Sequence, residues 1–210
     1  NFGPEFELVG RNEATTFTGF CNKHDVDVFA PIEKDNFYKG TDEQHFLYAY
    51  RAFARSYHKK LEETKGLSLS QETLSGNTDF SNNKKALTET DFKIYKNKFD
   101  TAIINKTYDI LETICIKLNK EVRFAVNSYL QLKDYKNIII NDFKNFTKPL
   151  KPLMINIFPE INESIILISC FKEDCKNYKI FFEDIKNANS SGLFLILNNL
   201  IPKYCENIIV

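Results

Sequence analysis

The residues of this chain best suited to chemistry lie close together near its start. Cys21, His24 and Asp25 place a thiol, an imidazole and a carboxylate within five positions, and Glu33 follows eight residues after Asp25. With 3 histidines and 5 cysteines in all, the chain has no denser collection of such groups. A thiol beside an imidazole and an acid suits a cysteine nucleophile with its base and its orienting group. These four residues therefore predict a hydrolase-type catalytic site, with Arg51 binding a negative group of the substrate.

The same segment also permits a metal site. Two residues separate Cys21 from His24. This is the spacing of one half of a tetrahedral zinc site, because a tight turn can aim both side chains at one metal. A full site needs two more ligands, for which Cys170 and Cys175, or His45, are the candidates. The pattern therefore predicts zinc, or another divalent metal, as a possible cofactor held by Cys21 and His24.

Two further roles for the segment stay open. His24, Asp25 and Glu33 form a donor set for a divalent cation that activates water, because imidazole and carboxylates suit hard or borderline metals. Alternatively the segment is structural, since buried polar groups on a long loop need partners whether or not they react. In that case Glu33 pairs with Arg51 or Arg55, and apolar residues bury the segment against the first helix. These apolar residues are Phe20, Phe29 and Ile32.

Composition indicates a single globular domain over residues 1–210. The hydrophobic content is 43%, with 19 phenylalanines, which supports a packed core. No apolar run reaches the ~18 residues that a membrane helix needs, and no secretory signal is visible at Asn1. The few cysteines predict reduced thiols and a cytoplasmic protein. We expect the natural chain to continue beyond residue 210, because the sequence ends on the apolar Ile208–Val210.

The formal net charge is +0, but it is unevenly distributed. Residues 84–152 hold 14 basic and 8 acidic side chains. Such a segment is able to attract a nucleic acid or an acidic protein. No arginine-rich or glycine-aromatic motif accompanies the lysines, and a solvated helix face with its loops is the commoner origin of such a charge excess.

The first half of the chain predicts helices joined by flexible segments. Residues 11–40 lack periodicity, which predicts a long functional or mobile loop. The capping-box pattern Thr41–Gln44 begins a helix with apolar residues at three- and four-residue spacing, and Gly66 is its expected end. Residues 67–86 are rich in Ser, Asn and Thr, which predicts a flexible linker. A second helix is expected from about Thr88 or Thr90 to about residue 119.

The second half of the chain predicts strands and then helices. Alternation at residues 122–126 is typical of a half-buried strand. The apolar runs 153–158 and 164–170 predict a hairpin with a five-residue loop. Helices are expected over about 174–188 and from residue 193 onward. This order predicts a helix-rich α+β fold with a small antiparallel sheet built from residues 122–170.

A set of residues in the first quarter of the chain forms a recognisable pattern: Gly19–Cys21, His24, Asp25, Phe29, Pro31–Glu33, Gln44, Phe46, Leu47 and Ala49–Ala52. In this pattern the chain resembles a group of uncharacterised bacterial proteins. The resemblance covers about residues 8–60 and implies a bacterial intracellular origin, with a stress or phage-defence role by association. It supplies no site residues.

Two functions of different classes follow from the sequence. The first is an intracellular hydrolase with its site at Cys21, His24, Asp25 and Glu33, and with no membrane partner. The second is a non-catalytic interaction module with a structural zinc or a purely structural segment at residues 20–33. That module would use residues 84–152 to contact an acidic protein or a nucleic acid. The sequence does not name a substrate for the first or a partner for the second.

Overall fold

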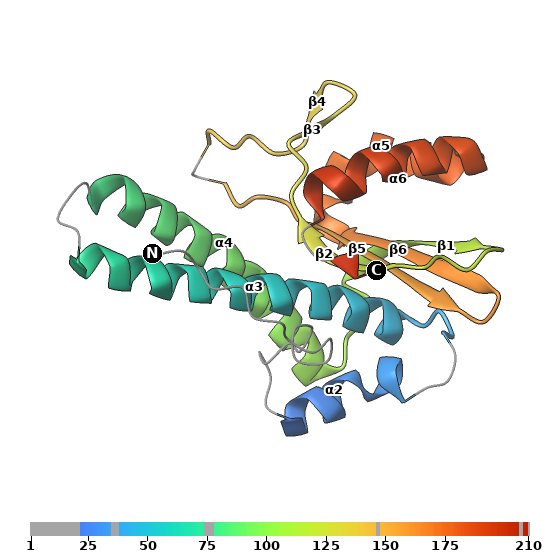
Figure 1. The fold of residues 1–210 in the computed structure, drawn as a ribbon, viewed down its shortest axis with the longest axis horizontal. Helices are drawn as coiled ribbons and strands as arrows, with labels where there is room; N and C mark the ends of the chain where they lie inside the picture. The colour runs from blue at the N-terminus through green and yellow to red at the C-terminus, as the bar shows by residue number, and fades with distance from the viewer. Residues whose placement is uncertain (1–21, 35–37, 74–77, 146–147, 206–207, 210) are drawn as a thin grey trace, which may run out of the picture.

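The computed structural model places helices on both faces of an antiparallel sheet (Figure 1). The described residues are 22–34, 38–73, 78–145, 148–205 and 208–209. Side chains are outside that description at residues 22, 24, 65–73, 78–90 and 209. The α+β class expected from the sequence is confirmed, and its strands follow the long helices in the chain.

The prediction of a loop over residues 11–40 is wrong for residues 22–33, because these residues form helix α2 (Asn22–Glu33). Three of its apolar residues, Val28, Phe29 and Ile32, join the core that also includes α3 (Asp42–Thr73). Only three residues make this stripe, and Pro31 interrupts it, so the helical period is weak in the sequence. Packing against α3 stabilises α2 more than intrinsic propensity does. Residues 11–21 lie outside the described part of the chain.

The predicted linker at residues 67–86 is also wrong in large part. Helix α3 continues to Thr73, past the expected stop at Gly66, and α4 (Thr78–Asn105) begins at Thr78. Ser, Thr and Asn have only modest helix penalties, which an already formed helix overcomes because adding a residue is easier than nucleation. Neither α3, α4 nor any other helix in the described ranges is long and apolar enough to cross a membrane.

The second helix ends earlier than the predicted residue 119. The Thr107 N–H bonds to the Ala102 carbonyl at 2.9 Å and the Lys106 N–H to the Ile103 carbonyl at 3.2 Å, with φ of 54° at Lys106. This is a Schellman cap, in which a left-handed residue stops the helix. Glycine usually takes that position, and lysine gives no such signal in the sequence. The following residues form strand β1 (Leu111–Leu118), where Thr and Ile side chains favour extended backbone.

Within the described ranges, five strands form one antiparallel sheet in the order β1-β6-β5-β2-β7. The other members are β2 (Ala125–Leu130), β5 (Leu153–Glu160), β6 (Glu163–Phe171) and β7 (Ile208–Ile209). The sheet therefore begins before the predicted range of 122–170. A separate hairpin pairs β3 (Asp134–Tyr135) with β4 (Ile138–Ile139), and it projects from the body (Figure 1). Both of its turn residues have positive φ, as a type I′ turn requires.

The predicted hairpin of β5 and β6 is confirmed, but its loop is shorter than expected. Glu160 pairs with Glu163, so only Ile161 and Asn162 connect the strands. Asn162 has φ of 64°, a left-handed conformation that asparagine tolerates better than most residues. The pairing consequently extends through Pro159, which the sequence pattern assigns to the loop.

Two separate cores cover the two faces of the sheet. The 3₁₀ turn Lys172–Asp174 leads into α5 (Cys175–Asn187), and α6 (Ser190–Tyr204) follows, which agrees with the predicted C-terminal helices. Helices α5 and α6 pack on one face, and α3 and α4 pack on the other. Figure 1 shows α5 and α6 above the sheet, α3 beneath it and α2 below α3. Because helices cover both faces, β6 is buried at every residue from Ser164 to Phe171.

Phe99 tests the core between α3, α4 and the sheet. Its buried ring lies 5.0–5.4 Å from the rings of Phe46, Tyr50, Phe53 and Phe171. We expect Phe99→Ala to lower the free energy of unfolding by about 3–5 kcal/mol in urea denaturation, because the deletion leaves a cavity. The matched control is Phe194→Ala on α6, where the ring is 43% exposed. Equal losses in the two variants would contradict this packing.

Candidate functional site

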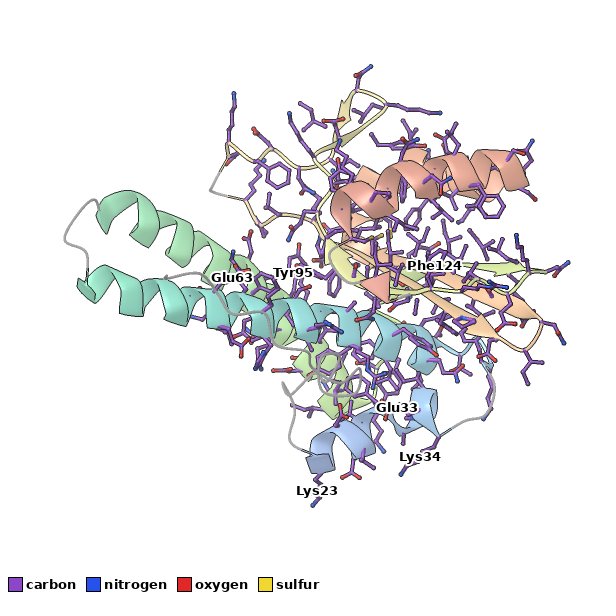
Figure 2. All side chains as sticks on the ribbon, viewed as in Figure 1. Lys23, Glu33, Lys34, Glu63, Tyr95 and Phe124 are labelled. Carbon is purple, nitrogen blue, oxygen red and sulfur yellow. The ribbon has the colours of Figure 1, made fainter. Side chains whose placement is uncertain are left out.

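Three of the four predicted catalytic residues belong to α2, and they are His24, Asp25 and Glu33. Cys21 lies outside the described residues, and the side chain of His24 is likewise not described. Asp25 is in the first turn of α2 and Glu33 is its last residue. Eight residues of helix correspond to about 12 Å along the axis, and Figure 2 shows Lys23 and Glu33 at opposite ends of α2. The prediction that Asp25 and Glu33 converge is therefore wrong, because the segment is a helix and not a tight loop.

Glu33 and Arg51 do come together, as an ion pair between α2 and α3. The Arg51 guanidinium also lies 4.5 Å from the centroid of the Phe29 ring, and that buried ring stacks on Tyr50 at 5.9 Å. This agrees with a structural role for the segment, in which Glu33 pairs with Arg51. Arg51, predicted to bind the substrate, already has an acidic partner. The contacts among Glu33, Arg51, Phe29 and Tyr50 hold α2 against α3.

The candidates for completing a zinc site are separated by the sheet. Cys170 and Cys175 have their sulfur atoms 3.2 Å apart, and both belong to the core beneath α5 and α6. His45 is on α3, on the opposite face. Among the described residues, no group of three or more His, Cys, Asp or Glu side chains is placed to hold a metal ion. Whether Cys21 and His24 bind zinc stays a prediction, since their side chains are not described.

A different thiol and imidazole are linked through one tyrosine. The Tyr38 hydroxyl lies 2.5 Å from His45 Nε2 and 3.3 Å from Cys115 Sγ. Tyr38 precedes α3, His45 is in its first turn and Cys115 is on β1. This cluster was not predicted from the sequence, because a helix that reaches residue 119 would place Cys115 on an apolar helix face. The β-branched run of residues 111–118 is the signal for a strand, which turns Cys115 to the same face as Thr113 and Lys117.

The capping contacts of α3 fix the turn that carries Tyr38. The Gln44 amide N donates to the Pro31 carbonyl, and the Gln44 side-chain oxygen accepts from the backbone N–H of Lys39 and of Gly40. The Gln44 backbone N–H donates to the Thr41 hydroxyl at 3.2 Å, which confirms this half of the predicted capping box. Gly40 has φ of 72°, which glycine adopts without strain. This network joins α2, the turn and α3, and so holds Tyr38 beside His45.

Aromatic rings and burial set the protonation of the cluster. Tyr38 meets the Phe158 ring edge-on at 5.9 Å, and Tyr48 stacks on the same ring at 4.5 Å. Burial lowers the pKa of His45, although Asp42 opposes this shift. Burial, and secondarily the hydrogen bond to Cys115, raise the pKa of Tyr38, and burial raises the pKa of Tyr48 to about 12. Near neutral pH, His45 is therefore an uncharged base, and Tyr38 keeps its proton.

Cys115 is exposed at the edge of the sheet. The Lys172 N–H bonds to the Ile110 carbonyl, and the register places Cys115 opposite Leu167. Hydrogen-bonded pairs alternate along an antiparallel ladder, so the Cys115 N–H and C=O point away from β6. In the part of the chain that the structure describes, no other strand pairs with this edge of β1. A ligand approaching the edge therefore meets both the thiol and a backbone N–H donor.

The lowered pKa of His45 predicts a pH-dependent stability. Above about pH 6.5, the ordinary pKa of histidine, the imidazole is neutral in both the folded and the unfolded state. Below that pH the unfolded state takes up the proton first, so the free energy of unfolding falls with falling pH, by at most about 1.4 kcal/mol per pH unit. The fall continues until the pH reaches the lower pKa of the folded state.

We expect His45→Gln to remove this component from urea denaturation measured between pH 7.5 and 5. The control is His58→Gln, a change to the same residue type further along α3, which should retain it. An unchanged pH slope in His45→Gln would show that the imidazole is not buried beside Tyr38.

Comparison with known proteins adds no constraint on this cluster. The protein-family models, the curated proteins and the solved structures that were searched contain no match to this chain. The resemblance of residues 8–60 to bacterial proteins stays a prediction. Function is therefore inferred from the geometry and chemistry of the described residues.

Proposed function

We propose that the protein is a thiol-dependent hydrolase in which Cys115 is the nucleophile. The observation that carries the proposal is the hydrogen-bonded series Cys115–Tyr38–His45. The sequence predicts the same reaction class with Cys21 and His24. That site stays a prediction, because the side chains of Cys21 and His24 are not described, whereas the contact of a thiol with a tyrosine and an imidazole is described at Cys115. The proposal requires a reducing compartment such as the cytoplasm, where the thiol stays free.

Tyr38 relays the proton in this proposal, because its single hydroxyl contacts both groups. In the structure the Tyr38 hydroxyl donates to Cys115 Sγ. For the transfer, the Tyr38 O–H turns to His45 Nε2, and the Cys115 thiol then donates to the Tyr38 oxygen. Moving each proton one step toward His45 leaves a thiolate that accepts from Tyr38 and an imidazolium that donates to Tyr38. The neutral state of His45 makes it able to receive the proton.

The thiolate then attacks an electrophilic acyl carbon, as in other cysteine nucleophiles. A bond forms between Cys115 Sγ and that carbon, and the leaving group departs with the proton returned from His45 through Tyr38. Water attacks the acyl-enzyme while His45 accepts its proton, the carboxylic acid leaves, and the Cys115 thiol is restored. The outward Cys115 N–H is available to stabilise the oxygen on which negative charge develops.

Alkylation kinetics test the relay. We expect iodoacetamide to label Cys115 at least about 10-fold more slowly in Tyr38→Phe and in His45→Gln than in wild type, because each change interrupts proton transfer. The readout is the labelled Cys115 peptide measured by mass spectrometry at pH 7. Tyr57→Phe and His58→Gln make the same chemical changes elsewhere on α3 and should leave the rate unchanged.

Hydrolysis of S-phenyl thioacetate tests the nucleophile. Cys115→Ser should abolish enzymatic hydrolysis, whereas Cys21→Ser should retain it. The reverse result would move the nucleophile to Cys21. Cys115 labelling rates that match wild type in both relay variants would identify Tyr38 as a structural brace between the turn and β1.

The projecting β3–β4 hairpin supports a second candidate function, that of an interaction module. Ile138 and Ile139 are 44% and 69% exposed, and Phe143 follows on the adjoining loop at 42%. Lys133 and Lys144 are exposed near them. Several other lysines in residues 84–152, including Lys136 in the hairpin turn, are already paired with acids. These pairs are Lys96–Asp100, Lys98–Glu173, Lys117–Glu163 and Lys136–Asp184. Lys133 and Lys144 beside these exposed apolar side chains suit an acidic partner that also carries apolar side chains.

Salt dependence tests this second function. Retention on immobilised poly-glutamate should fall steeply between low and physiological salt, because exposed charges are screened. Lys133→Gln combined with Lys144→Gln should elute at lower salt than wild type. The control combines Lys176→Gln with Lys179→Gln on α5. Salt-insensitive retention, or no retention at low salt, would count against the interaction module.

A further inference from the structure

The outer edge of β1 carries a row of backbone hydrogen-bonding groups. The N–H and C=O of Cys115 point away from β6, and the alternation of an antiparallel ladder turns those of Thr113 and Lys117 the same way. Successive outward residues are about 7 Å apart, because a strand rises about 3.4 Å per residue. Among the described residues, none forms a strand on this edge. Donors and acceptors therefore flank Cys115 on both sides.

This edge is regular, and its charged side chains have partners within the chain. Every residue of β1 pairs with β6 in an unbroken register, and none of them is proline. Bulges, prolines and projecting charges are the features that normally keep an edge strand from pairing. Lys117 pairs with Glu163 on β6 at 3.5 Å, and Glu112 pairs with Lys186 on α5 at 3.6 Å. Both charges are therefore directed toward the body of the protein.

An extended peptide is the class of ligand that matches this row. It presents N–H and C=O groups at the same spacing as β1, so it can continue the ladder as one more strand. A lipid acyl chain has no hydrogen-bonding groups along its length, and the backbone of a nucleic acid has no N–H donors. The repeat of outward groups therefore favours a polypeptide segment.

An antiparallel peptide strand brings a carbonyl group to Cys115. In a hydrogen-bonded pair of residues, the N–H of each binds the C=O of the other. The peptide residue opposite Cys115 therefore has its carbonyl oxygen bound by the Cys115 N–H, the donor available to a developing negative charge. The exposed thiol belongs to the same residue. One residue thus supplies both the nucleophile and a donor to the carbonyl that it attacks.

We propose that the substrate is a peptide that adds to β1 as an antiparallel strand and is cleaved after the residue opposite Cys115. This inference rests on the proposed hydrolysis at Cys115. A bond forms between Cys115 Sγ and the carbonyl carbon of that residue, the peptide C–N bond breaks, and the leaving amine takes the proton from His45 through Tyr38. Water then releases the new carboxyl group and restores the thiol.

The other face of β1 sets a preference for apolar side chains. Ile114 is buried, and Ile116 packs against the same core beneath α5 and α6. In the added strand, the residues before and after the cleaved residue lie opposite Ile116 and Ile114, because side chains alternate between the faces. Cross-strand pairs of apolar residues stabilise a sheet. We therefore expect apolar residues on both sides of the cleaved residue.

Alkylation of Cys115 by two chloromethyl ketones tests strand addition. The probes are acetyl-Ala chloromethyl ketone and acetyl-Thr-Ile-Thr-Ile-Ala chloromethyl ketone, which carry the same reactive group and differ in the strand attached to it. The readout is the labelled Cys115 peptide measured by mass spectrometry at pH 7. We expect the full chain to react at least about 10-fold faster with the longer probe, because several hydrogen bonds to β1 hold that probe at the thiol.

Lys117 provides the variant and its matched control. Lys117→Pro should reduce the ratio of the two rates by about 5-fold, because proline removes the outward N–H that binds the central Thr of the longer probe. Lys117→Gln keeps that N–H and should retain the wild-type ratio. The Lys117 N–H lies outside the β1–β6 ladder, so Lys117→Pro should fold, and circular dichroism checks it. On the wild-type chain, N-methylation of the central Thr of the probe should reduce the ratio by a similar factor.

Three outcomes would overturn the proposal. The first is an equal rate for the two probes on the wild-type chain. The second is a ratio that Lys117→Pro and the N-methylated probe leave unchanged. The third is a ratio that falls as the protein concentration rises, because β1 then pairs with a second copy of the chain.

The shorter probe keeps this proposal separate from the proposed function. Its rate reports the thiol alone, and it should fall in Tyr38→Phe and in His45→Gln if these residues activate Cys115. A shorter-probe rate that these variants leave unchanged therefore counts against the relay. An equal rate for the two probes counts against strand addition.

Discussion

The burial of both faces of the sheet is the constraint on which the rest of the structure depends. The central strands β5 and β6 are apolar on both sides and therefore need a helical layer above and below. Helices α5 and α6 supply one layer, and α3 with α4 supplies the other. Because α3 crosses the face formed by β2 and β5, its first turn lies near the sheet. This placement lets His45 and Tyr38 approach Cys115 on an edge strand.

The contacts around the start of α3 combine structure with chemistry. Gln44 joins three segments through hydrogen bonds to Pro31, Lys39 and Gly40, and it is buried. Glu33 and Arg51 hold α2 on the same helix. An exposed ion pair contributes only about 0–1 kcal/mol, so the buried Phe29 ring stabilises this junction more than the charges do. The result is a rigid setting for a thiol, a phenol and an imidazole that come from different parts of the chain.

Local patterns in the sequence predict the elements whose signals are strong. The β5–β6 hairpin, α5 and the start of α3 follow from apolar runs, helical spacing and a capping pattern. The end of α4 cannot be predicted in this way, because Lys106 takes the left-handed position that glycine usually occupies. Helix α2 cannot be predicted either. It is short and contains Pro31, and it is stabilised by tertiary packing, which the spacing of apolar residues in the sequence does not reveal.

The candidate site is less predictable than the fold. Sequence patterns draw attention to neighbours in the chain, and the pairing of Glu33 with Arg51 is one of the alternatives they indicate. The Cys115–Tyr38 contact joins residues 77 positions apart, and it arises only once β1 is a strand beside the start of α3. A separation of that size leaves no periodic trace in a single sequence. The sequence therefore points to a plausible thiol but not to the one with an imidazole linked to it.

The tautomer of His45 is the most direct test of the hydrogen-bonded series. Two-bond ¹H–¹⁵N NMR of the wild-type chain near neutral pH distinguishes the protonated ring nitrogen from the unprotonated one. If Tyr38 donates to His45, Nε2 is unprotonated and Nδ1 carries the proton, and Tyr38→Phe shifts the Nε2 resonance. A neutral ring protonated at Nε2, or a ring already charged at neutral pH, would contradict the relay, because Nε2 could not then accept a proton from Tyr38.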